Sequence, residues 1–133
     1  MSHRKKSKQK KFKNGFAGVP RKLMNSEKFN SLSANSVKLL LELCRQYRGS
    51  NNGDLTMALS VLIKRGFKSR DTINRARKQL EENKLIIQTR QGRFLNPGGV
   101  CALYALTWQP IDECGGRHDE EPTIGPVYKF WDL

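Results

Sequence analysis

The chain has 133 residues, 37% of them hydrophobic, which is enough for one domain with tails but not for two domains. No apolar run approaches the roughly 20 residues of a membrane-spanning helix. The net charge of +13 is uneven, because residues 1–110 hold 23 of the 25 Lys and Arg but 6 of the 12 Asp and Glu (net +17), while residues 111–133 carry −4. So positive a body repels itself unless an anion binds it, and nucleic acid is the usual partner.

The first 15 residues form a basic arm without any acidic side chain. Such a run cannot bury enough surface to order itself, so we expect it to be disordered when free. It is suited to follow phosphates or to enter a minor groove, although it is also compatible with a solubilising tail or a nuclear address. Its cations are Arg4, Lys5, Lys6, Lys8, Lys10, Lys11 and Lys13.

The next segments predict an extended stretch over 16–20, a helical turn near 27–31 and a helix over 34–47. Ser33 precedes that helix as its N-cap, and Gly49 ends it. Its apolar residues occupy two stripes, which indicates a helix central to the core. We interpret Cys44 on one stripe as a small buried hydrophobic residue. The apolar residues are Val37, Leu39, Leu40, Leu41, Leu43 and Cys44.

Residues 50–54 (SNNGD) predict a loop, followed by a short helix over 57–65 that Gly66 ends. Ser69 then caps a third helix that runs to about residue 83. Ile73, Ala76 and Leu80 face the core at helical spacing. The side chains expected on the far side of this helix are Thr72, Asn74, Arg75, Lys78 and Gln79.

Two strands, 85–90 and 100–108, follow with a long glycine-rich hairpin loop between them. Residues 109–133 hold three prolines and three glycines and predict an extended tail. The expected fold is therefore α+β, mainly α with a small β-hairpin. It comprises a basic arm (1–15), a domain over 16–108 and an acidic, aromatic tail (109–133).

The short helix, glycine turn and capped helix form a helix-turn-helix unit. In such a unit the second helix enters the major groove and presents its N-terminal residues to base edges. Arginine pairs with guanine and asparagine with adenine, so the residue types here suit base reading. We expect this role for Lys68, Ser69, Arg70, Thr72, Asn74, Arg75 and Lys78.

Positive charge continues around this helix, with ten basic and three acidic residues between positions 64 and 93. Such a bias is stronger than that of an ordinary solvated helix face, and it extends into the hairpin. We expect Lys64, Arg65, Arg90 and Arg93 to contact phosphates, the last two from the hairpin.

On these residues the segment 33–108 resembles winged helix-turn-helix proteins. The run 66–73 (GFKSRDTI), followed by Ala76, Leu80 and Glu81, looks like their turn and recognition helix, and Leu85-Ile86 like their first wing strand. Residues 16–20 (FAGVP) with 32–33, and 103–108 (LYALTW) with 110–112, look like small winged-helix proteins of phages, plasmids and integrated elements. The resemblance implies duplex-DNA binding, as a transcriptional regulator of a mobile genetic element or as an origin-binding replication factor.

Other sites have weaker support. Cys114 and His118, with His3 or Asp119, would make at most an incomplete zinc site. A flexible tail cannot hold the geometry of carboxylate chemistry, so we expect its acids to fold back on the basic body or to meet a partner. These are Asp112, Glu113, Asp119, Glu120 and Glu121. We therefore expect neither an enzyme, nor a metal site, nor a cofactor.

Tyr128, Phe130 and Trp131 either pin the tail to its own domain or anchor a second protomer, and a homodimer through the tail is one expectation. The three cysteines, Cys44, Cys101 and Cys114, suggest no disulfide framework. No apolar run follows the basic N-terminus, so no signal peptide is expected and the cytoplasm, or the bacterial nucleoid, is the expected location. An RNA- or ribosome-associated protein, or a module that binds an acidic protein, remain alternatives.

Overall fold

The structure is a computed structural model that describes residues 12–93 and 99–129. The described part is an α+β fold, as the sequence predicts, with five helices and one two-stranded antiparallel sheet. In chain order these are α1 (Arg21–Met24), α2 (Glu27–Asn30), α3 (Ala34–Gln46), α4 (Leu59–Lys64), α5 (Arg70–Glu82), β1 (Ile86–Arg90) and β2 (Leu103–Leu106). A short 3-10 turn, Cys114–Gly116, follows β2.

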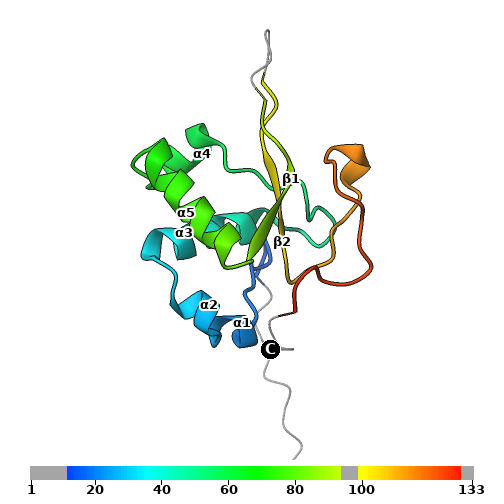
Figure 1. Cartoon of the computed structure of the whole chain (residues 1–133), viewed down its shortest axis with the longest axis horizontal. Helices are drawn as coiled ribbons and strands as arrows, with labels where there is room; N and C mark the ends of the chain where they lie inside the picture. The colour runs from blue at the N-terminus through cyan, green and yellow to red at the C-terminus, as the bar shows by residue number, and fades with distance from the viewer. Residues whose placement is uncertain (1–11, 94–98, 130–133) are drawn as a thin grey trace, which may run out of the picture.

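The three helices α3, α4 and α5 and the 3-10 turn of the C-terminal segment lie on opposite sides of the hairpin. Figure 1 shows α3, α4 and α5 on one side of β1 and β2, and the 3-10 turn on the other. The two long helices, α3 and α5, pack directly against each other. α5 therefore has one side on the core and leaves the opposite side to solvent.

The core fills the space between these three helices and the hairpin. Leu39, Leu40 and Leu43 of α3 are fully buried, and α5 contributes Ile73, Ala76 and Leu80, as their spacing predicts. Cys44 is also buried, as expected of a small hydrophobic residue, and burial raises the pKa of its thiol to about 12. Leu41, which the sequence places on a core stripe, is instead half exposed, because the core covers only one side of α3.

The hairpin pairs Ile86 with Leu106 and Gln88 with Tyr104, and a bulge follows Gln88. Leu55 pairs with Tyr104 on the other edge of β2, through backbone hydrogen bonds of 2.8 and 3.2 Å. The second strand is shorter than the 100–108 expected from its β-branched and aromatic residues. Val100 pairs with Arg93 beside the loop. Thr107 N–H donates to the Leu85 carbonyl in the register of the ladder, but Leu85 N–H donates to the Leu80 carbonyl instead of returning the bond, so the regular pairing ends at Leu106.

The described part of the C-terminal segment, 109–129, is irregular but closely bound to the domain, so the expectation of a flexible tail is wrong for it. Ile111 and His118 are buried. Backbone N–H groups of Asp112, Asp119 and Tyr128 donate to carbonyls of the loop before Leu55, of β1 and of Thr107, at 2.9 Å each. These bonds fix the segment along the edge of the hairpin.

Candidate nucleic-acid interface

The N-terminus of α5 is built by a turn and a side-chain cap. Gly66 has a φ of +98°, which favours glycine, and it reverses the chain after α4. Ser69 is extended and its hydroxyl accepts a hydrogen bond from Thr72 N–H at 3.2 Å, which confirms the predicted N-cap. Since the Ser69 and Thr72 hydroxyls also bond each other at 3.1 Å, both expected base-reading hydroxyls are already used to shape the helix.

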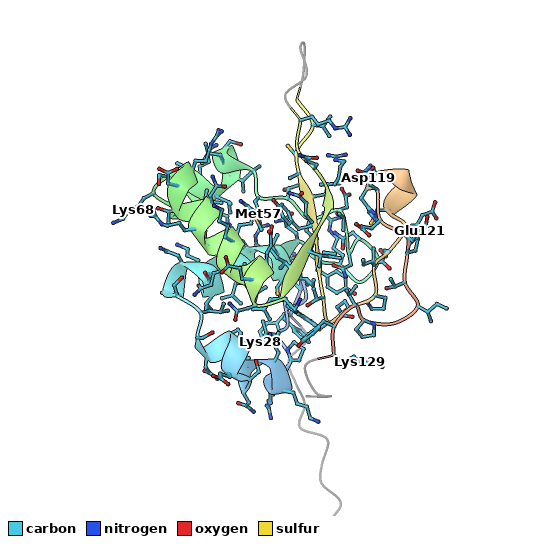
Figure 2. The ribbon with its side chains drawn as sticks, viewed as in Figure 1. Lys28, Met57, Lys68, Asp119, Glu121 and Lys129 are labelled. Atoms are coloured by element: carbon cyan, nitrogen blue, oxygen red, sulfur yellow. The ribbon has the colours of Figure 1, made fainter. Side chains whose placement is uncertain are left out.

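Most of the other expected base-reading residues lie at the surface of α5, Arg75 and Lys78 on its outward side and Arg70 and Asn74 toward the hairpin. Arg70, Arg75 and Lys78 are exposed, Asn74 is half-buried, and Lys68 lies exposed just before the helix. In Figure 2 Lys68 lies at the margin of the molecule on the helical side. Among the described residues, none of these four cations forms an ion pair. They are therefore available to an anionic or polar ligand.

A shallow pocket separates α5 from the hairpin. It has a volume of about 250 Å³, and Arg70, Asn74 and Arg77 line it from α5 while Met57 and Tyr104 line it from the other side. Arg77 Nη1 donates to Glu81 Oε1 at 3.0 Å, so the charge of this arginine is paired within α5. Burial raises the pKa of the Tyr104 hydroxyl, and a hydrogen bond from Gln88 partly opposes that shift.

The third side of α5 is bonded to the start of α3. Gln79 Oε1 accepts hydrogen bonds from Ser33 N–H at 2.9 Å and from the Ser36 hydroxyl at 2.5 Å. The sequence places Gln79 on the far side of the helix, and this prediction is wrong. Gln79 Nε2 also donates to the Ser31 carbonyl at 3.4 Å, and no helical period can reveal these three partners.

The two hairpin arginines differ in their surroundings. Arg90 donates through Nε and Nη2 to the Cys101 carbonyl and through Nη1 to the Arg117 carbonyl. Its guanidinium thus links the hairpin to the C-terminal segment. These bonds occupy the group that the sequence assigns to a phosphate contact. Arg93 is exposed and forms no ion pair in the described ranges.

At the end of α4, Lys64 is exposed, but Arg65 pairs with Glu42 of α3. Glu42 is buried, and sequence reasoning missed it. The signal is an acid inside the apolar run LLLELC, because a carboxylate at such a position needs cations to compensate its burial. Arg45, one turn further on α3, is its second partner.

The other residues singled out from the sequence belong to the basic arm and to the C-terminal aromatic group, and most of them lie outside the described ranges. Lys13 is exposed, while Arg4, Lys5, Lys6, Lys8, Lys10 and Lys11, together with Phe130 and Trp131, lie beyond the described residues. Tyr128 packs against its own core and under Lys28, so it holds the C-terminal segment to the domain.

The Cys114–His118 turn is held by hydrogen bonds. His118 Nδ1 accepts from Glu120 N–H at 3.1 Å, so Nε2 carries the hydrogen and donates to the Asp112 carbonyl. The Cys114 thiol, whose pKa burial raises, contacts the Asn52 carbonyl. Over the described ranges no three His, Cys, Asp or Glu side chains gather as metal ligands would.

The helices of the described part are all too short or too polar to cross a membrane. The chain matches no protein-family model, and comparisons with curated proteins and with solved structures give no significant match.

Proposed function

We propose that this chain is a winged helix-turn-helix protein that binds duplex DNA sequence-specifically and regulates transcription. In this proposal α4, the turn at Gly66 and α5 form the helix-turn-helix unit, and α5 enters the major groove. The β1–β2 hairpin serves as the wing. Regulation of a mobile genetic element rests on the sequence resemblance alone.

The observation that carries the proposal is the state of the cations on α5. Arg75 and Lys78 lie on its exposed side with no acidic partner among the described residues, whereas Arg77, on the side toward the hairpin, is neutralised by Glu81. A helix that only covers a core gains a few tenths of a kcal/mol, about 0.2–0.5, from each ion pair on its surface. Leaving the outward cations unpaired fits a helix whose outer side meets an anion.

The phosphate contacts proposed from the sequence need revision. Arg93 and Lys64 stay candidates because both are exposed and outside any ion pair that the structure describes. Arg65 also stays a candidate, because it bonds Glu42 through Nε alone. Arg90 is reassigned to a bracing role, since its guanidinium bonds two backbone carbonyls. The basic arm adds affinity through phosphates rather than sequence preference.

The test is selection of the full-length protein against a library of random duplex DNA, followed by titration of the selected pool. We expect a defined motif, and Arg75→Ala should relax the preference at one or two base pairs by about 1–3 kcal/mol. Arg21→Ala is the matched control, because it removes one exposed guanidinium from α1 and should lower affinity without changing the motif. Strong binding without any motif would refute base reading and leave only the phosphate term.

A further inference from the structure

A second cationic surface lies between α3 and α4, away from the outward side of α5. It is a hollow of about 660 Å³ to which α3 contributes Lys38, Leu41, Glu42 and Arg45. The end of α4 and the turn after it contribute Lys64, Arg65 and Gly66. We call this surface the α3–α4 hollow. Four of its side chains are cationic and one is acidic, so it carries net positive charge.

The single acid of the hollow holds two of its arginines in place. Glu42 is 5% exposed, and a buried carboxylate is costly unless it is paired. Arg45 Nε donates to Glu42 Oε2 at 3.1 Å, and Arg65 Nε donates to both Glu42 oxygens. Because both arginines bind Glu42 through Nε, their terminal Nη1 and Nη2 groups have no hydrogen-bond partner among the described residues.

Lys38 is also fixed, although by an aromatic ring. Its ammonium lies 5.4 Å from the centroid of Phe67, a cation–π distance, and close to the backbone of Gly66. Leu41, beside it on α3, is 50% exposed and gives the hollow an aliphatic edge. The hollow thus combines oriented cations with a small apolar surface.

We propose that the α3–α4 hollow binds a backbone phosphate of nucleic acid, held by Arg45 and Arg65 and assisted by Lys38. Guanidinium groups with free terminal nitrogens match phosphate oxygens, and orientation by Glu42 lowers the entropy lost on binding. Leu41 offers its methyl groups to the adjacent sugar. Asp119 and Glu121 of the acidic C-terminal segment lie across the hairpin from Lys68 (Figure 2). No described residue of that segment lines the hollow.

The inference does not depend on base reading by α5, because a phosphate contact carries no sequence information. It predicts a contribution to affinity that is equal for all sequences and that weakens with salt. Each phosphate contact adds about 0.9 to the slope of log K against log[salt]. One contact therefore raises the binding constant about eightfold at 0.1 M salt relative to 1 M salt.

The decisive variant is Glu42→Gln in the full-length protein, tested on a labelled 20-bp duplex of arbitrary sequence by fluorescence anisotropy across salt. If only net charge mattered, removing an acid would tighten binding. Loss of the group that orients Arg45 and Arg65 should instead weaken binding at least twofold. Tighter binding by a variant that is folded by circular dichroism would overturn the proposal.

A second comparison decides the matter even if Glu42→Gln fails to fold. Arg45→Gln should weaken binding about eightfold at 0.1 M salt and make the salt slope shallower by about 1. Arg48→Gln removes the same charge from an exposed arginine beyond α3, and it should change binding less than twofold. Equal effects of the two variants would overturn the proposal.

The same variants separate this contact from other occupants. If Arg45→Gln leaves the affinity for DNA unchanged but alters the sedimentation coefficient of the protein, the hollow binds a protein partner. That result would refute the phosphate contact. Failure of Arg75→Ala to alter any motif would reject base reading by α5, whereas the Arg45 and Arg48 comparison would still report on the hollow.

Discussion

Asn52 offers the sharpest test of how the C-terminal segment is held. It is fully buried, and its Nδ2 donates to the carbonyls of Leu106 and Pro110 at 2.9 Å and of Gln109 at 3.2 Å. Its Oδ1 accepts from Leu106 N–H at 2.7 Å. This one side chain therefore links the end of β2 to the turn that follows it by hydrogen bonds to both.

The substitution Asn52→Leu keeps the number and branching of the side-chain heavy atoms but removes every one of these bonds. Both backbone groups of Leu106 that bond Asn52 are buried, and each unsatisfied buried group costs about 1–3 kcal/mol. The expected loss in the free energy of unfolding is therefore about 4 kcal/mol. That is a large fraction of the roughly 5–15 kcal/mol by which a domain is stable.

Urea unfolding followed by circular dichroism measures this loss, provided that the slope with urea is unchanged. Asn35→Leu is the matched control, because Asn35 is exposed on α3 and forms no hydrogen bond through its side chain within the described residues. It should change stability by less than about 0.5 kcal/mol. A loss below about 1 kcal/mol for Asn52→Leu would refute the argument that Asn52 holds β2 and the following turn.

Ser69→Ala removes the side-chain cap of α5, so it should lower the free energy of unfolding by about 1 kcal/mol and lower the midpoint of thermal unfolding. Ser60→Ala, at an exposed serine of α4, is the control, and equal midpoints for the two variants would contradict the capping role. Burial raises the pKa of Cys44 from 9.0 to about 12, so its contribution to stability is complete below pH 9 and is lost as pH rises toward 12. Urea unfolding at pH 8 and 10.5 should therefore show a steeper loss for the natural protein than for Cys44→Ala, and parallel losses would exclude this role. In α4, Leu62→Ala should cost about 2–5 kcal/mol because Leu62 is 2% exposed, whereas Ile63→Ala, at 45% exposed, should cost much less; equal losses in urea unfolding would contradict the orientation of α4.

The elements predicted from local signals are the ones that the structure confirms. Ser33 and Ser69 each precede a helical apolar pattern, and each caps its helix through its own hydroxyl. Caps, glycine turns and apolar periodicity act over a few residues, so they can be recognised in a single sequence. They established α3, α5, the turn at Gly66 and the α+β composition.

The errors concern side chains whose surroundings come from distant parts of the chain. Gln79 bonds α3 from 43 residues away, and Arg90 bonds the Arg117 carbonyl from 27 residues away. Glu42 pairs with Arg65, the residue that follows α4, from 23 residues away. Amphipathic spacing divides a helix into an inner and an outer side, but it does not say which polar residue on the border finds a partner.

These tertiary contacts also narrow what α5 can bind. Its side toward α3 is occupied by Gln79, and on its side toward the hairpin Arg77 is neutralised by Glu81. Its outward side exposes Arg75 and Lys78 together with the acids Asp71 and Glu82. A uniform polyanion gains nothing from these carboxylates, whereas the floor of a major groove offers hydrogen-bond acceptors on guanine and a donor on cytosine. The mixture of charges on this side of α5 therefore suits a ligand that presents both kinds of group, and under the proposed function the purely electrostatic contribution falls to other surfaces, among them the α3–α4 hollow.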